Sequence, residues 1–133
     1  MTWPAVIAGD EAEVEPTPQW IRSTLGQIRL HEHEAERFIC LIRSGDDQMN
    51  VLAVDGAFVL EWFLASEGGH LAGFRTGQEP ARIQKRPGLL ARLFGARSPL
   101  HGSRISLEEA SQVLDAYVSG ANTFPAFVWK TIR

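Results

Sequence analysis

Four consecutive residues hold the side chains best suited to bind a metal ion. In His31-Glu32-His33-Glu34 the imidazoles alternate with carboxylates. On a strand, His31 and His33 would share one face and could bind zinc or nickel. Two ligands do not complete such a site, and a third would have to come from His70, His101 or a distant carboxylate. We therefore expect a solvated loop here and no metal.

The other reactive side chains do not form a catalytic set. Cys40 is the only cysteine and lies within an apolar run, which is typical of a buried, inert thiol. Nothing in the sequence brings Glu61 and Glu67 within reach of each other for acid/base chemistry. Gly68-Gly69 matches no phosphate-binding motif and predicts a hairpin turn instead. We therefore expect a protein that is not an enzyme and has no cofactor.

Charge is distributed unevenly along the chain. Residues 1–36 carry a balance of −5 and residues 37–74 of −3, whereas residues 75–104 carry +6. These blocks are either solvated faces of opposite sign or an acidic surface presented to a basic partner, with the basic segment as a secondary contact. The total charge of −3 argues against direct binding of nucleic acid.

Length and composition predict one globular domain over residues 1–133. A chain of 133 residues that is 44% hydrophobic and 22% charged can build a single core. The first ten residues lack the pattern of a secretory signal, and no apolar run approaches the ~20 residues of a membrane span. We expect a cytoplasmic protein that does not bind membranes. The edge strands of its sheet leave both monomer and dimer open.

Two segments carry the signals of amphipathic helices. Thr17 precedes a proline, which is typical of a helix start, and apolar residues at helical spacing continue to about Arg29. Ser106 and Glu109 form a capping box, and Gly120 supplies the stop after the second helix.

Short apolar runs separated by turn residues predict the strands. Asp55-Gly56 is a strong hairpin signal between two of them. Residues 10–16 are expected to form an acidic loop. The expected strands are residues 1–9 at an edge, Arg37–Arg43, Asn50–Val54, Ala57–Ala65, His70–Phe74 and Ala126–Thr131. The predicted fold class is therefore α+β, an antiparallel sheet of about five or six strands with a central meander and two main helices packed on one face.

The segment between the meander and the second main helix is punctuated by prolines and glycines. Ala81–Lys85 predicts a short strand, and Leu89–Phe94 predicts a helix of about two turns with one apolar face. Basic residues flank that apolar face, so binding to an anionic membrane surface is an alternative. Packing against the sheet edge explains the pattern as well, and we favour it.

Three stretches resemble the immunity-protein family numbered first among those of bacterial polymorphic toxin systems. They are the meander Met49–Phe63, the pair Gly68-Gly69, and the segment Ile105–Lys130, in which a helix ends at a glycine and a proline leads into a strand closing on tryptophan. The resemblance covers roughly half to two-thirds of the chain and rests on structural motifs. Residues 78–104 depart from the short connection that is usual in the family, so this segment is a place where partner choice could lie.

The resemblance implies a cytoplasmic protein that neutralises a cognate secreted toxin by binding it. Many toxins paired with such proteins are deaminases or nucleases, and a basic groove that holds nucleic acid suits an acidic inhibitor. From the charge distribution we expect the partner contacts to include Asp46, Asp47, Asp55, Glu67, Arg92 and Arg97. Two other functions stay open, namely an intracellular small-ligand-binding or regulatory module and a small metal hydrolase using His31 and His33.

Overall fold

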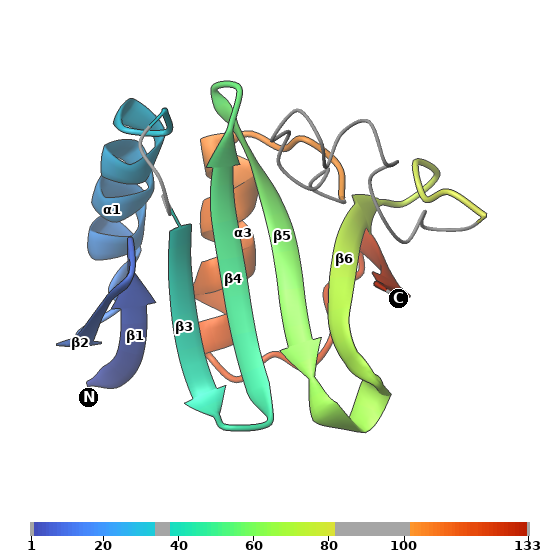
Figure 1. Cartoon of the computed structure of the whole chain (residues 1–133), viewed down its shortest axis with the longest axis horizontal. Coiled ribbons are helices and arrows are strands. Elements are labelled where there is room, and N and C mark those ends of the chain that lie inside the picture. The colour runs from blue at the N-terminus through green and yellow to red at the C-terminus, as the bar shows by residue number, and fades with distance from the viewer. Residues whose placement is uncertain (1, 34–37, 82–101, 133) are drawn as a thin grey trace, which may run out of the picture.

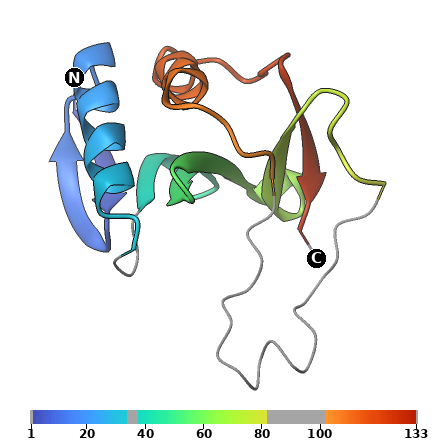
Figure 2. The ribbon, with the colours of Figure 1, turned by 90° about the horizontal axis from the view of Figure 1, so that it is seen from above.

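A computed structural model describes residues 2–33, 38–81 and 102–132. These residues form one seven-stranded antiparallel sheet in the order β2-β1-β3-β4-β5-β6-β7, together with two α-helices (Figure 1). Both helices lie on the same side of the sheet (Figure 2). The α+β class is confirmed, and the sheet has one or two strands more than expected. Among the described residues, no helix has the length and apolar character needed to cross a bilayer.

The centre of the sheet is the predicted meander. Its turns include the expected hairpin at Asp55 and Gly56. Their positive φ values of 50° and 78° are those of a type I′ turn, which needs positive φ at both central residues. Gly56 also donates its backbone N–H to the carboxylate of Glu32 at 2.8 Å. The strands are β3 (Phe38–Ser44), β4 (Asp47–Val54), β5 (Ala57–Leu64) and β6 (Gly69–Arg75), with a short 3-10 helix, η1 (Ala65–Glu67), before β6.

The N-terminal edge corrects two expectations. β1 (Trp3–Ile7) is not an edge strand, because β2 (Asp10–Val14) pairs along its outer side. The prediction of a loop over residues 10–16 is therefore wrong for residues 10–14. Pro4 is tolerated inside the sheet because the pairing of β1 with β3 begins only at the next residue, so its missing N–H leaves that ladder intact. The other edge is β7 (Phe127–Thr131), paired with β6 as the closing strand.

The two main helices begin where their caps predicted. α1 (Pro18–Leu30) starts after Thr17, whose side chain accepts from the backbone N–H of Trp20. α3 (Leu107–Val118) starts after Ser106, and both hydrogen bonds of the capping box with Glu109 are present. Arg22 of α1 reaches across to Glu108 and Asp115 of α3 at 3.2 and 3.3 Å, which ties the helices together.

The core lies between the helices and one face of the sheet. α1 contributes Ile21, Leu25 and Ile28, and α3 contributes Val113, Leu114 and Tyr117. Each large apolar side chain buried here stabilises the fold by about 1.5–3 kcal/mol. The strands contribute the alternate residues that face the helices, among them Ala5, Ile39, Leu41, Met49, Val51, Phe58, Leu60, Trp62 and Leu71.

The second face of the sheet carries the residues that alternate with this core. Cys40 and Val59 are buried there, whereas Ile42, Leu52 and Phe63 are half-buried. No helix of the described residues lies on this face (Figure 2).

Ser103 binds the chain to β6 shortly after residues 82–101, which the structure does not describe. Its backbone N–H donates to the carbonyl of Gly73 at 3.0 Å, and its hydroxyl accepts from the N–H of Arg75 at 2.9 Å. Gly102 has a φ of +109°, and a Cβ there would come within 2.9 Å of the Gly73 carbonyl oxygen, so glycine is required. Apart from Ala81, the strand and helix predicted over 81–94 lie outside the described residues.

Candidate functional site

Three of the four predicted acidic contacts lie at one end of the sheet. Asp46 is exposed in the β3–β4 turn, and Glu67 is exposed in η1. A hydrogen bond of 3.0 Å from the backbone N–H of Ala65 to the carbonyl of Asp46 joins these two turns. Asp55 lies in the turn at the other end of β4, about 25 Å away at the usual rise per strand residue (Figure 1). The four carboxylates therefore do not form one surface. Arg92 and Arg97 lie outside the described residues.

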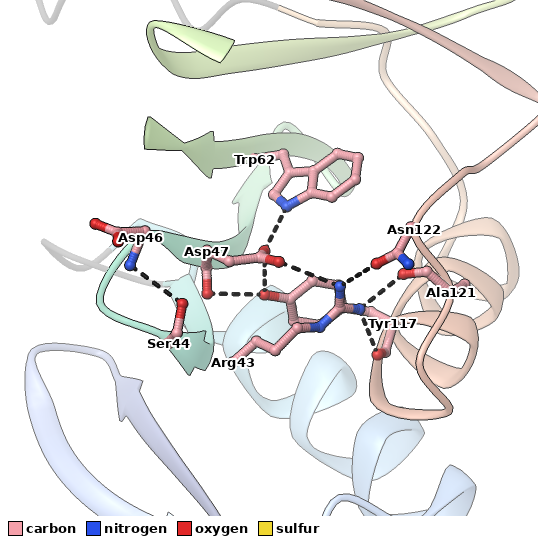
Figure 3. Close-up of polar contacts among 8 residues, drawn as sticks. All are labelled: Arg43, Ser44, Asp46, Asp47, Trp62, Tyr117, Ala121 and Asn122. Atoms are coloured by element: carbon pink, nitrogen blue, oxygen red, sulfur yellow. Dashed lines mark hydrogen bonds and ion pairs between the residues drawn. The ribbon is translucent and has the colours of Figure 1, made fainter. Parts of the chain in front are cut away.

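Asp47 differs from its neighbour because its carboxylate is bonded inside the molecule (Figure 3). Its Oδ1 accepts from the hydroxyl of Tyr117 and from the indole Nε1 of Trp62, each at 2.8 Å. Its Oδ2 accepts from Arg43 at 3.2 Å, and the Asp47 side chain is only 18% exposed. A carboxylate with three donors is satisfied within the fold, so Asp47 positions the turn that presents Asp46.

Arg43 closes the end of α3 beside this carboxylate. Its Nη2 donates to the carbonyls of Tyr117 and Ala121 at 2.8 and 2.7 Å, and its Nη1 donates to Asn122 at 2.9 Å. Tyr117 lies in the last turn of α3, so the guanidinium adds a second donor to a helix-end carbonyl that also accepts from the N–H of Gly120. It also lies 4.1 Å from the ring centre of Tyr117. Burial, and then the hydrogen bond to Asp47, raise the pKa of Tyr117, which keeps its hydroxyl a donor.

The candidate metal and nucleophile positions take structural roles. No group of three or more metal-ligating side chains occurs within residues 2–33, 38–81 and 102–132. Glu32, from the predicted loop, holds the β4–β5 turn through Gly56. Burial raises the pKa of the Cys40 thiol, which keeps it protonated and unreactive at neutral pH.

An acidic edge strand is the feature that the sequence analysis missed. On β2 the side chains of Asp10, Glu11 and Glu13 are exposed. An open groove of about 510 Å³ runs beside it, lined by Pro4, Ala5, Val6, Glu11, Ala12, Glu13 and Ile42. Gly9 was the available signal, because a two-residue hairpin needs positive φ at both positions; Ala8, with a φ of 52°, is an uncommon residue for the first of them.

A smaller groove of about 280 Å³ separates α3 from the segment that leads into β7. Phe124, Pro125 and Phe127 line it with Gln112 and Glu109. The hydrogen bond from Arg75 lowers the pKa of Glu109 to about 2, so this carboxylate is charged at neutral pH. Since Glu109 is already paired with Arg75, the groove offers a ligand mainly apolar contacts.

Three kinds of comparison bear on the identity of the chain. Comparison with protein-family models, with curated proteins and with solved structures gave no match.

Proposed function

We propose that the chain is an immunity protein that binds a cognate secreted toxin in the cytoplasm and neutralises it by covering the toxin's active site. The observation that carries this proposal is a set of exposed carboxylates with no ion-pair partner among the described residues. On the β2 edge and at the end of the sheet below β4 they are Asp10, Glu11, Glu13, Asp46 and Glu67, and Asp55 is a further one in the β4–β5 turn. Exposed carboxylates that no described cation pairs with complement a basic surface.

The order of structural elements also supports the proposal. The stretches that resemble the immunity-protein family are the β4–β5 hairpin, the turn before β6, and α3 followed by β7. Gly120 has a φ of +99° directly after α3, and Pro125 precedes β7, as that resemblance leads one to expect. These features are architectural, so they support a binding function without identifying the toxin.

The available surface is large enough for a tight inhibitor. The chain exposes 7840 Å², and a standard interface needs about 800 Å² from each partner, roughly a tenth of that area. Nanomolar affinity corresponds to about 12 kcal/mol, which a few well-buried anchors can supply. A toxin that acts on nucleic acid, such as a deaminase or nuclease, has the basic groove that these carboxylates would fill.

The first test is to isolate the partner from cells shown to contain the toxin. We expect the tagged chain to co-purify with one stoichiometric protein that carries the C-terminal domain of a large secreted protein, identified by mass spectrometry. Mixing the purified proteins should then abolish the activity of that domain. A chain that emerges alone from such cells, and that leaves the domain fully active, contradicts the proposal.

Association kinetics then test which end of the sheet faces the toxin. Asp46→Asn removes one exposed charge at one end, and Asp55→Asn is the matched change at the other, where asparagine tolerates the positive φ. Charged contacts act mainly on the association rate, and that rate falls with added salt. We expect the Asp46→Asn variant to associate more slowly than the Asp55→Asn variant. Equal rates for wild type and both variants would remove these residues from the interface.

The smaller groove favours a second candidate, a small-ligand-binding module. The apolar walls beside α3 could hold a ligand with an apolar body, and a bound ligand raises the melting temperature by an amount that grows with the logarithm of its concentration relative to its Kd. A thermal-shift screen of metabolites tests this alternative. Phe127→Ala, which removes one wall, should abolish any shift that depends on the groove.

A further inference from the structure

The β2 strand presents its two glutamates on the side of the sheet away from the helices. In the register of β1 and β2, Glu11 lies opposite Val6 and Glu13 opposite Pro4. Successive strand residues point to opposite faces, so these side chains share the second face, whereas Ala5 and Val14 point toward the core. Glu11 and Glu13 are therefore separated by one residue and aligned along one edge.

The groove beside these glutamates has an apolar floor. Pro4 and Val6 of β1 and Ile42 of β3 form the floor, and the two glutamates stand on its outer side. A lysine or arginine side chain combines an aliphatic stem with a charged head. A basic side chain that arrives from the outer edge meets the two carboxylates of β2 first, and the apolar floor behind them keeps the neighbouring surface free of competing charge.

The backbone of β2 offers a second kind of contact. β2 is the last strand of the sheet on this side, so half of its N–H and C=O groups face outward without a strand partner (Figure 1). An extended peptide can add to such an edge through main-chain hydrogen bonds, and its alternate side chains then decide specificity.

Charge disfavours the pairing of this edge with a second copy of the chain. Antiparallel pairing of two β2 strands centred on Ala12 would place Glu11 of one copy opposite Glu13 of the other. Like charges directly opposite each other in a sheet are destabilising. The same geometry favours a partner strand that carries positive charge at alternate positions.

From these features we infer that the β2 edge binds an extended segment of the partner protein that has lysine or arginine at every second position. The segment adds an eighth strand to the sheet beside β2. Its basic side chains on the second face of the sheet pair with the adjacent Glu11 and Glu13. The inference rests on the proposed function in one respect, since it takes the partner to be the toxin.

The experiment uses the full chain and a synthetic probe, the capped peptide Lys-Val-Lys-Val-Lys-Val. Titration into the isotope-labelled protein should shift the backbone amide signals of Asp10–Val14, most strongly those of Glu11 and Glu13, whose backbone groups face outward. Glu11→Gln with Glu13→Gln should weaken binding roughly fivefold to tenfold, because two cross-strand charge pairs are lost. The control, Asp46→Asn with Glu67→Gln, removes the same charge elsewhere and should leave the affinity unchanged.

A second peptide separates strand addition from simple charge attraction. Methylating the backbone nitrogens of the central lysine and the central valine keeps every side chain but removes backbone donors that face β2 in either strand direction. We expect this peptide to lose most of its binding. Three results would each overturn the inference. The two peptides could bind equally well, the signals at β2 and around Asp46 could shift by the same amount, or no signal could shift at millimolar peptide.

Failure of this inference can be distinguished from failure of the proposed function. If the Glu11→Gln, Glu13→Gln variant captures and inhibits the toxin as wild type does, the binding surface lies elsewhere and the immunity function stands. If the peptide binds at β2 but no toxin domain is captured or inhibited, the surface stands and the immunity function is wrong.

Discussion

Asp46 and Asp47 are neighbours in the chain, yet one carboxylate faces solvent and the other is hydrogen-bonded inside the fold. Asp46 is exposed, and only its backbone groups are hydrogen-bonded in the described part of the chain. Asp47 accepts from Arg43, Trp62 and Tyr117 and thereby connects β3, β4, β5 and α3. A charge count along the sequence treats the two residues as equivalent. It cannot distinguish them, because residues far away in the chain decide which carboxylate is buried.

Asp47→Ala should destabilise the fold far more than Asp46→Ala. Loss of the Asp47 carboxylate leaves the Arg43 guanidinium, the Tyr117 hydroxyl and the Trp62 indole without this acceptor, which we expect to cost about 2–4 kcal/mol. An exposed change such as Asp46→Ala should stay within about 0.5 kcal/mol. Urea denaturation followed by tryptophan fluorescence measures both free energies of unfolding. Equal values would show that the Asp47 contacts do not stabilise the fold.

Glu109 should make the free energy of unfolding depend on pH in the acidic range. Its pKa is about 2 in the folded protein and near 4.5 in an unpaired side chain, so its contribution is complete above pH 5 and is lost as the pH falls toward 2. Glu109 and Arg75 are each about a third exposed, so solvent screening reduces the contribution to about 1 kcal/mol. Glu109→Gln keeps a capping residue and should flatten the pH dependence of unfolding between pH 5 and 2. An unchanged slope would contradict this assignment.

At the scale of elements, Gly73 of β6 and Gly26 of α1 differ in the space that surrounds them. A Cβ on Gly73 of β6 would lie 2.9 Å from the ring of Trp129 and 3.3 Å from Leu60. Trp129 packs in turn against Trp62 and Phe124, so it has little room to move. Gly26 lies within α1 and a Cβ there would meet nothing within 4 Å. Glycine is needed for close packing in the strand and only weakens the helix.

Substituting each glycine with alanine should therefore change stability in opposite directions. Gly26→Ala should raise the free energy of unfolding by about 0.5–1 kcal/mol through helix propensity. Gly73→Ala should lower it by about 1–3 kcal/mol, the usual cost of overpacking. Thermal unfolding of the two variants beside wild type gives the comparison. Destabilisation by both would mean that α1 is more tightly packed around Gly26 than its open surroundings indicate.

The helices and the meander could be predicted because their signals are local. The Thr17 and Ser106 caps and the Asp55-Gly56 turn each act within a few residues of chain. β2 could not be predicted in the same way, since its sequence lacks β-branched and aromatic residues until Val14. Its structure comes from pairing with β1, and its side chains stay in solvent, so hydrophobic periodicity gives no indication of the strand.

For the whole molecule, the sequence indicated an acidic surface but not where it lies. Asp46 and Glu67 are 21 positions apart and share one end of the sheet, whereas Asp55 lies between them in sequence and occupies the other end. Strand reversal decides this arrangement, because each hairpin returns the chain to the level where it started. The most acidic strand, β2, lies at an edge remote from both turns in the order of the sheet.

The hydrogen bonds between Ser103 and β6 have an evolutionary consequence. They hold Ser103 beside Gly73 and Arg75 of β6. The segment between Arg75 and Ser103 can therefore change in length without altering any strand pairing. Lengthening a closed loop is cheap, about 0.6 kcal/mol for each doubling. We expect natural relatives of this chain to keep glycine at position 102 and a hydroxyl at position 103, while insertions and deletions accumulate between Arg75 and Gly102.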